Sequence, residues 1–377
     1  MNVAGLIFSN IHDQSIPEMT RKRTMASIPF GCRYRLIDFA LSNMVNSDIT
    51  TVGVITHYNY QSLLDHIGTG KDWDLARRSG GIKILPPYIA AYENTAAGKL
   101  YSNRLEAIMG AENFVHRCNA DYLVLSDCDV IMNIDLKPVI DEHIRTGALI
   151  TMVTKHLNAE SYHFDKPLNV VRMEEDGLIT ESSHTKPETG EVDVCTNIMV
   201  IKRSDLQNII ADSLARGYKS FSKDIIPAGI KKGIIRAYRF DGWYYDIGTL
   251  ESYFTASMQL LTTEARESLF GQADRQIYTK IRNSAPTKYS EDAVVKNSLI
   301  ADGCVIEGTV ENSILFRGVR VGKGTVVRNS ILLQDTFVGS DVQLNCAITD
   351  KNVIIKDGRM LSGHETMPFF IGKGMMV

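Results

Sequence analysis

The chain has 377 residues, more than one hydrophobic core usually holds, so we expect two domains. Its 41 basic and 44 acidic residues give a net charge of −3, which argues against a protein that binds nucleic acid through its phosphates. The six cysteines include no Cys-x-x-Cys pair, so neither a disulfide framework nor a zinc site is indicated. The apolar run 3–8 is too short for a signal-peptide core and no run reaches membrane-spanning length, so we expect a cytoplasmic protein with no membrane partner.

Residues 1–262 alternate short apolar strands with amphipathic helices. This pattern predicts an α/β domain with a Rossmann-like, mostly parallel sheet covered on both faces. Apolar residues at helical spacing predict a helix over Leu36–Asn46, between the first two strands of a βαβ unit. The expected strands are 3–8, 51–56, 121–126 and 149–154.

After residue 292 the sequence becomes repetitive. Similar blocks begin at Asn297-Ser298, Asn312-Ser313, Asn329-Ser330 and, more weakly, Asn345-Cys346, at spacings of 15, 17 and 16 residues. Such repeats predict a solenoid, and their imperfect hexapeptide rhythm favours a left-handed parallel β-helix over residues 293–377. The polar segment 263–292 is the expected connector, and the tail 367–372 is expected to cover the last rung or to meet another subunit.

Several strings carry a family resemblance: Phe30-Gly-Cys-Arg-Tyr-Arg-Leu-Ile-Asp-Phe-Ala-Leu-Ser-Asn43, Lys223-Asp-Ile-Ile-Pro227 and Tyr245-Asp-Ile-Gly-Thr-Leu-Glu251. They resemble the bacterial glucose-1-phosphate adenylyltransferases (ADP-glucose pyrophosphorylases), and the resemblance covers nearly the whole chain. It implies a nucleotidyltransferase-like domain followed by a left-handed β-helix. The reaction of that family converts ATP and glucose 1-phosphate into ADP-glucose and pyrophosphate.

The resemblance fails where the nucleotide phosphates would bind. Active members carry Gly-Gly-x-Gly-x-Arg-Leu after the first strand, because glycines let backbone amides approach and wrap phosphates. Here that stretch begins with Ser9 and Asn10, contains no glycine, and has Ser15 in the position of the arginine. Two further motifs are replaced, by Met25-Ala26 and by residues 103–106. The resemblance therefore implies a degenerate loop without catalytic residues.

Other site residues are better preserved. Asp129 and Asp246 match the two metal-binding aspartates, which implies a Mg²⁺ site or its remnant. Without the resemblance, aspartates at strand ends equally suit turns or helix caps. Lys186, before Pro187, resembles the lysine that binds the sugar phosphate, although a solvated surface lysine is the alternative.

Arg33 and Arg35 lie just before the first long helix. A guanidinium matches phosphate bidentately, and a basic residue at the position of Arg33 resembles one that binds phosphorylated effectors in the family. These arginines are therefore candidates for an effector phosphate site. A solvated basic face is the alternative.

The leading functional hypothesis is a non-catalytic regulatory subunit that activates a catalytic homologue in glycogen biosynthesis. Its expected partners are that homologue, in a hetero-oligomer expected to be a tetramer, and a phosphorylated metabolite or nucleotide as effector. One alternative is a self-sufficient sugar-1-phosphate nucleotidyltransferase with an atypical phosphate loop. Two others are a sensor that needs no catalytic partner and an acyltransferase that uses the β-helix. No histidine lies between His184 and His364 to serve the acyltransferase as a base.

Overall fold

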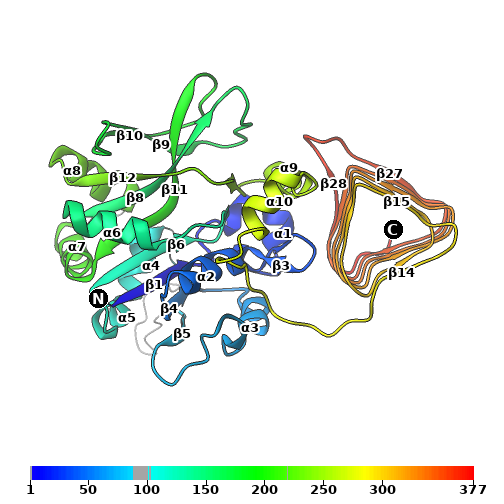
Figure 1. Ribbon diagram of the computed structural model, residues 1–377, viewed down its shortest axis with the longest axis horizontal. Helices are drawn as coiled ribbons and strands as arrows, with labels where there is room; N and C mark the ends of the chain where they lie inside the picture. The colour runs from blue at the N-terminus through cyan, green and yellow to red at the C-terminus, as the bar shows by residue number, and fades with distance from the viewer. Residues whose placement is uncertain (1, 88–100, 102, 219) are drawn as a thin grey trace.

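The computed structural model describes residues 2–87, 101, 103–218 and 220–377. A layered α/β domain lies at one end of the molecule and a β-helix, seen end-on as a triangle, lies at the other (Figure 1). Within the described residues no helix is long and apolar enough to cross a bilayer.

The α/β domain is built on a nine-stranded sheet. Its path runs β10-β9-β11-β6-β1-β4-β5, and β8 and β12 extend it beside β11. The strands are β1 (Val3–Phe8), β4 (Thr51–Ile55), β5 (Gly81–Leu85), β6 (Tyr122–Asp127), β8 (Ile150–Asn158), β9 (Leu168–Met173), β10 (Ile179–Thr185), β11 (Glu191–Lys202) and β12 (Ile235–Phe240).

The sheet is mixed rather than mostly parallel. Its centre is parallel as predicted, since β1 pairs in parallel with both β4 and β6. The long strand β11 instead runs antiparallel to β6, β8 and β9, and β9 pairs antiparallel with β10. Only five residues join β9 to β10, a connection short enough for a hairpin but too short for a parallel crossover.

Helices cover both faces of this sheet, because successive strand residues point to opposite sides. Ile7 and Val124 pack with residues of α2, α3 and α6, while Leu6 and Leu125 pack with residues of α4, α5, α7 and α8. The helices are α1 (Pro17–Thr20), α2 (Leu36–Asn46), α3 (Gln61–Ile67), α4 (Arg104–Gly110), α5 (Glu112–Arg117), α6 (Lys137–Thr146), α7 (Arg203–Arg216), α8 (Ile226–Lys231), α9 (Leu250–Gln259) and α10 (Thr263–Phe270).

Two short ribbons lie beside the sheet and position site residues. In one, β2 (Pro29–Phe30) pairs antiparallel with β3 (Tyr34–Arg35). In the other, β7 (Val130–Ile131) pairs antiparallel with β13 (Tyr245–Asp246). The second ribbon brings Asp246 next to Asp129, although 117 positions separate them, because the Ile247 amide donates to the Asp129 carbonyl over 2.6 Å.

The β-helix has three faces, each a sheet of five parallel strands. Its interior is a continuous apolar column of valine, isoleucine and leucine side chains, which stacked repeats bury together. The first face holds β14 (Lys288–Tyr289), β17 (Val305–Ile306), β20 (Arg320–Val321), β23 (Phe337–Val338) and β26 (Ile354–Ile355); the second β15 (Val294–Lys296), β18 (Thr309–Glu311), β21 (Val326–Arg328), β24 (Gln343–Asn345) and β27 (Met360–Ser362); the third β16 (Leu299–Ile300), β19 (Ile314–Leu315), β22 (Ile331–Leu332), β25 (Ala347–Thr349) and β28 (Phe369–Ile371).

The repeated asparagines form one corner of this β-helix. Asn297, Asn312 and Asn329 have φ of 41°, 46° and 44°, in the left-handed region that asparagine tolerates better than most residues. In the next rung that conformation belongs to Cys346, with φ of 47°. The fourth repeat therefore begins one residue later than the sequence suggested, because the register pairs Arg328 with Asn345.

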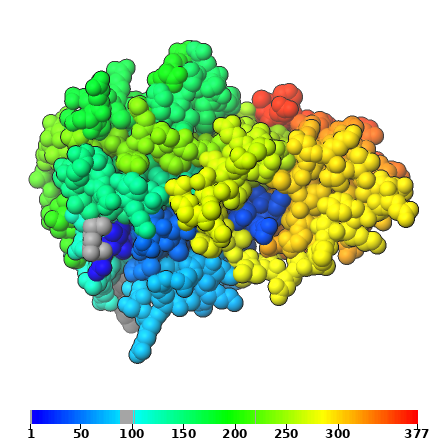
Figure 2. Space-filling model, viewed as in Figure 1, coloured from blue at the N-terminus to red at the C-terminus, as the bar shows by residue number. Residues whose placement is uncertain are grey.

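The predicted connector, 263–292, contains α10 and the first β-helix strand, β14. Figure 2 shows this yellow stretch of chain crossing between the two domains. A shared apolar core joins the domains, in which Phe30 and Leu260 pack in the same cluster as Ile314 and Ile331 of the β-helix. The tail forms β28 on the last rung, pairing with β25.

Candidate functional site: a carboxylate cluster and a cationic pocket

The loop after β1, which would have to hold the nucleotide phosphates, is closed by its own side chains. The Ser9 hydroxyl donates to the Ile55 carbonyl over 2.7 Å, and the Asn10 amide donates to Asp13 Oδ2 over 2.5 Å. Asn10 Oδ1 accepts from the Thr56 hydroxyl at 2.8 Å. Ser9, Asn10 and Asp13 are all buried, so the polar groups of the loop bind one another instead of pointing into an open cradle.

Asp13 disfavours the binding of an anion in this loop. Its Oδ1 accepts from the Met25 amide over 2.6 Å, which ties the loop to the segment that follows α1. Burial raises the pKa of Asp13 to about 7, although the bonds from Met25 and Asn10 oppose the shift. Ser15 ends a short 3₁₀ turn, is exposed, and supplies no positive charge. The loop thus places a carboxyl group in the stretch where the family resemblance implies glycines.

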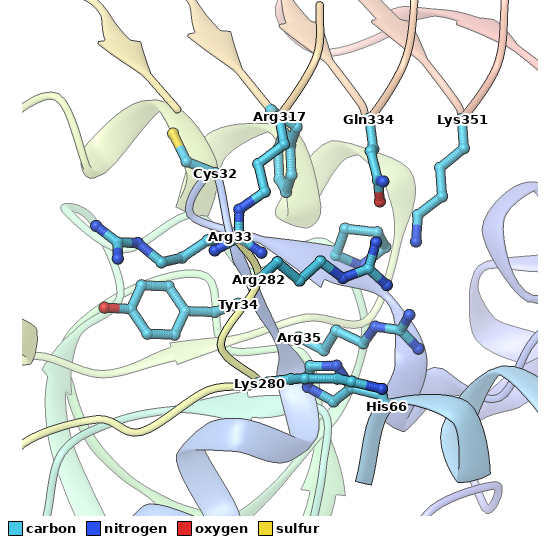
Figure 3. Close-up of a pocket in the computed structure, with 12 residues that line it drawn as sticks. Cys32, Arg33, Tyr34, Arg35, His66, Lys280, Arg282, Arg317, Gln334 and Lys351 are labelled. Atoms are coloured by element: carbon cyan, nitrogen blue, oxygen red, sulfur yellow. The ribbon is translucent and has the colours of Figure 1, made fainter. Parts of the chain in front are cut away.

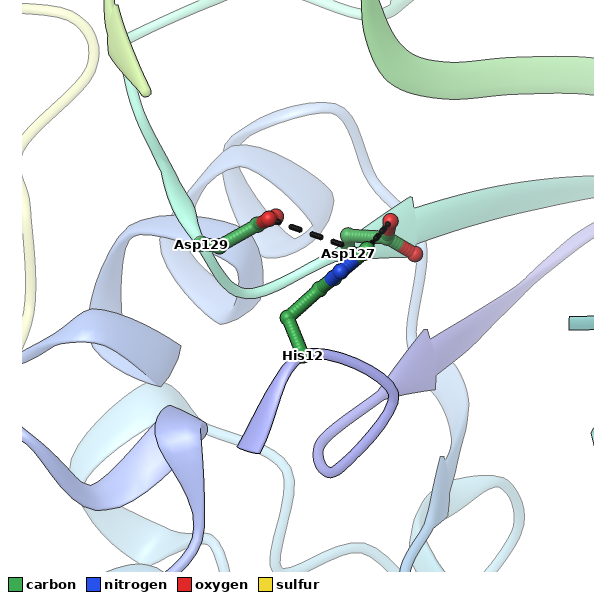
Figure 4. A group of neighbouring side chains, drawn as sticks. All are labelled: His12, Asp127 and Asp129. Atoms are coloured by element: carbon green, nitrogen blue, oxygen red, sulfur yellow. Dashed lines mark hydrogen bonds and ion pairs between the residues drawn. The ribbon is translucent and has the colours of Figure 1, made fainter. Parts of the chain in front are cut away.

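The same loop directs His12 at Asp127, the last residue of β6, and at Asp129, which follows it. His12 Nε2 lies 3.0 Å from Asp127 Oδ2 and 3.6 Å from Asp129 Oδ2 (Figure 4). The His12 side chain is 30% exposed, whereas neither aspartate side chain has any exposed surface. The Arg104 guanidinium, from the start of α4, forms an ion pair with the same oxygen, Asp127 Oδ2.

Lys166 completes the cluster. Its Nζ lies 2.6 Å from Asp246 Oδ1 and 3.8 Å from Asp129 Oδ2, so one ammonium faces both aspartates that the sequence assigns to a metal. The stem of Lys166 passes directly over Gly248, where a Cβ would lie 2.1 Å from the lysine Cε. The absence of a side chain at Gly248 therefore makes room for this lysine. We call His12, Arg104, Asp127, Asp129, Lys166 and Asp246 the carboxylate cluster.

The protonation states of the cluster follow from these pairs. Burial alone would lower the pKa of His12, but Asp129 and Asp127 outweigh it and raise that pKa to about 9. Burial raises the pKa of Asp246 to about 6 against the opposing charge of Lys166. Burial would also raise the pKa of Asp127, yet Arg104 and His12 hold it below its ordinary value. Near neutral pH the cluster is therefore a set of ion pairs.

The donor set of this cluster matches a divalent cation only in part. Ligand atoms of His12, Asp127 and Asp129 all lie within 4.8 Å of one another, the single such group among the described residues. Carboxylate oxygens also suit Mg²⁺, and both oxygens of Asp129 lack a hydrogen-bond donor. Each carboxylate nevertheless already faces a protein cation, and Lys166 lies between Asp129 and Asp246, so the arrangement as it stands does not fit Mg²⁺ held by that pair.

Lys186 lies outside this cluster. It is exposed, immediately after β10, and no contact with the cluster is recorded for it among the described residues. The chain has two further Lys-Pro pairs, Lys137-Pro138 and Lys166-Pro167, and of these Lys166 contacts the carboxylates of the cluster. The role of Lys186 in sugar-phosphate binding stays a prediction.

A second charged site lies where the two domains meet. Six cationic side chains line it: Arg33, Arg35, Lys280, Arg282, Arg317 and Lys351. Cys32, Tyr34, His66 and Gln334 contribute to its walls, and none of the described residues that line it is acidic. We call this site the cationic pocket. It joins four distant parts of the chain, namely the β2–β3 ribbon, α3, the segment 280–282 and the β-helix (Figure 3).

The two predicted effector arginines both line this pocket, but they differ in orientation. Arg35 is 7% exposed, and its guanidinium donates to the Ser62 carbonyl and hydroxyl. Figure 3 shows the ends of Arg35, Arg282 and Lys351 on one side of the pocket, whereas Arg33 points to the other side, past Tyr34. The sequence missed Arg282 and Lys351 because only the packing of the β-helix against the first domain brings them to Arg35.

The pKa of Lys351 shows how this arrangement disfavours a further positive charge. Burial, followed by the charges of Arg35 and Arg23, lowers the pKa of Lys351 to about 7, with Asp350 opposing the shift. Asp350 is already committed to Arg23, whose guanidinium donates to both of its oxygens at 2.7 and 2.9 Å. Arg317 is the pocket cation with an acidic partner, Asp302, whose Oδ1 lies 3.1 Å from its Nε. A pocket lined by several like charges is chemically suited to a polyanion such as a phosphate ester.

Comparison with known proteins agrees with this architecture. The nucleotidyl transferase family model matches residues 16–263, and the model for a GlmU-like C-terminal hexapeptide domain matches residues 284–366. The chain is thus a nucleotidyltransferase-family protein with a hexapeptide-repeat β-helix.

The similarity to individual proteins is more specific. The glycogen biosynthesis protein GlgD of Bacillus subtilis (strain 168) is 33% identical over 374 residues, which cover 99% of this chain and 96% of that protein. The glucose-1-phosphate adenylyltransferases of Fervidobacterium nodosum and Bacillus thuringiensis (strain Al Hakam) are each 32% identical, over 95% and 91% of this chain and 85% and 90% of theirs. The chain therefore belongs to the family of GlgD and glucose-1-phosphate adenylyltransferase, a nucleotidyltransferase family of glycogen biosynthesis.

Proposed function

We propose that this chain is a regulatory subunit of glucose-1-phosphate adenylyltransferase, with little or no activity alone, which activates a catalytic homologue. The observation that carries the proposal is the closed loop after β1. In this loop the Ser9 hydroxyl donates to Asn10 Oδ1, and the Asn10 amide donates to Asp13 Oδ2. Position 15 holds a serine, which carries no positive charge.

This loop removes what the reaction requires. Transfer of a nucleotidyl group develops charge on phosphate oxygens, which backbone amides, a cation and a metal normally stabilise. Loss of an arginine and of a preorganised loop removes several kcal/mol of such stabilisation, which corresponds to rates reduced at least about a thousandfold. The scaffold that positions the loop remains complete, as a subunit that works through contacts with a homologue requires.

The direct test is synthesis of ADP-glucose by the purified chain, alone and mixed with a homologue that keeps the glycine-rich loop. We expect negligible pyrophosphate release by the chain alone and a higher rate per catalytic subunit in the mixture. Turnover of the isolated chain at about one per second, an ordinary enzymatic rate, would instead support the alternative of a self-sufficient nucleotidyltransferase. The grouping of His12, Asp127 and Asp129 at metal-ligand spacing is the observation that favours that alternative.

The proposal extends to an effector and a partner. The cationic pocket suits a phosphorylated metabolite or nucleotide that contacts Arg35, Arg282 and Lys351, with Arg33 at its edge. Because the pocket includes both domains, a ligand there would fix their relative position and so act on subunit contacts. We propose a hetero-oligomer, most simply a tetramer, with the catalytic homologue. Analytical ultracentrifugation of each chain and of the mixture tests it, and unchanged species in the mixture would contradict it.

A further inference from the structure

The carboxylate cluster holds as many basic side chains as acidic ones. It contains three buried aspartates, Asp127, Asp129 and Asp246, and three basic side chains that contact them, His12, Arg104 and Lys166. Buried charges are tolerated when each is paired, and a surplus of either sign is costly.

Lys166 lies where a metal ion would have to be shared between Asp129 and Asp246. Mg²⁺ and similar ions sit about 2.1 Å from a carboxylate oxygen. An ion on the line from Asp129 Oδ2 to Lys166 Nζ, which is 3.8 Å long, would lie within about 1.7 Å of the ammonium nitrogen. Metal and lysine therefore exclude each other, and the glycine at 248 shows that the backbone accommodates the lysine.

His12 likewise faces two aspartates, Asp127 and Asp129. The loop that carries it is held by the Asn10–Asp13 and Met25–Asp13 bonds, which keep the imidazole beside Asp127 and Asp129. Its Nε2 lies 3.0 Å from Asp127 Oδ2 and 3.6 Å from Asp129 Oδ2, so an ion about 2.1 Å from Asp127 Oδ2 on the line to that nitrogen would lie only about 0.9 Å from it. The imidazole therefore occupies the place of a cation shared by these two carboxylates.

We propose that His12 and Lys166 are internal substitutes for the divalent cation, so that the chain keeps the aspartates of a metal site but holds them with its own side chains. The aspartates then serve the stability of the domain, and the chain needs no metal in this position. This inference deepens the proposed regulatory role, because it gives a second reason for the missing activity. It does not depend on that role, since a metal-free subunit can activate a partner or fail to do so.

Manganese provides the probe, because Mn²⁺ binds such oxygen sites and its free form is counted directly by electron paramagnetic resonance. Titration of Mn²⁺ alone, without nucleotide or partner, into the full chain should show no stoichiometric binding at Asp129. The double variant His12→Ala/Lys166→Met should bind one Mn²⁺ at least tenfold more tightly than the wild type. Adding Asp129→Asn to that variant should abolish the new site. Circular dichroism checks that each protein is folded, and His12→Asn/Lys166→Gln is the substitute pair if the first does not fold.

Two results would overturn the proposal. One is stoichiometric Mn²⁺ binding by the wild type that His12→Ala or Asp129→Asn weakens, since His12 would then be a metal ligand. The other is absence of binding in both folded double variants, since the two cations would then not be what keeps the metal out. Either result leaves the mixing experiment on regulation untouched, so the two proposals fail separately.

Discussion

The carboxylate cluster and the cationic pocket are both assemblies of charged side chains, and they differ in how the charges are balanced. In the cluster, His12, Arg104 and Lys166 each face an aspartate. In the pocket, Arg35, Arg282 and Lys351 lie together, and the part of the chain that the structure describes contributes no acidic side chain to its lining. A balanced cluster is complete in itself, whereas a group of like charges gains free energy when an anion binds. The comparison therefore distinguishes a cluster whose charged side chains pair with one another from a pocket that is lined by six cations.

The largest expected effect comes from breaking a pair in the carboxylate cluster. Asp127→Asn leaves Arg104, whose side chain is 10% exposed, and the partly exposed His12 beside a neutral amide, and we expect a loss of about 3–5 kcal/mol in the free energy of unfolding. Urea denaturation at pH 7 measures it. The control is Asp274→Asn, which removes a 3.9 Å pair with Arg275 from a side chain that is 79% exposed and should cost about 0–1 kcal/mol. Equal losses in the two variants would show that the cluster is not a buried ion-pair network.

In the cationic pocket we expect a substitution to raise the free energy of unfolding instead of lowering it. Lys351→Met removes one of several like charges and should raise the free energy of unfolding at pH 6 by about 2 kcal/mol. The folded pKa of Lys351 is lowered from 10.5 to about 7, so the penalty is complete below pH 7. Between about pH 7 and 10.5 the unfolded chain binds the proton and the folded chain does not, so wild-type stability rises with pH. The advantage of the variant should shrink by pH 9, and a loss of stability in the variant would contradict the comparison.

Phosphate binding tests which side of the cationic pocket holds an anion, the side of Arg282 or the side of Arg33. Inorganic phosphate should raise the unfolding temperature of the chain, and Arg282→Ala should raise the phosphate concentration for half of that shift about tenfold, or about 1.4 kcal/mol. Arg33→Ala should raise it less than about threefold, because Arg33 points away from Arg35 and Lys351. Arg320→Ala, an exposed change on the β-helix outside the pocket, controls for net charge. Equal effects of Arg282 and Arg320 would refute a phosphate site here.

The smallest effect should come from Lys186→Ala. The side chain is exposed and lies outside both sites, so the free energy of unfolding should change by less than about 0.5 kcal/mol and phosphate binding should not change. Lys166→Ala is the matched change at another Lys-Pro pair and should destabilise the chain strongly, because it leaves Asp246 unpaired. A tenfold loss of glucose 1-phosphate binding in Lys186→Ala, measured by calorimetry, would restore the sugar-phosphate role implied by the family resemblance.

The sequence by itself determined the order of elements and the two architectures. Helical spacing placed α2 at residues 36–46, and the Asn-Ser repeats predicted the β-helix, because both signals are local and periodic. The sequence also showed that the loop after β1 lacks glycines and an arginine. It did not reveal the antiparallel course of β11, which depends on which strands become neighbours, nor the true corner residue Cys346, which depends on rung register.

Only the tertiary structure decided what the charged residues do. His12, Lys166 and Asp246 are separated by 154 and 80 positions, and they meet because the β7–β13 ribbon and the loop after β1 converge at the end of β6. Lys351 lies 316 positions from Arg35 and reaches it only through the packing of the β-helix on the first domain. Whether charges are paired depends on the distances between side chains in the folded chain. The spacing of residues in the sequence therefore does not distinguish the paired charges of the carboxylate cluster from the like charges of the cationic pocket.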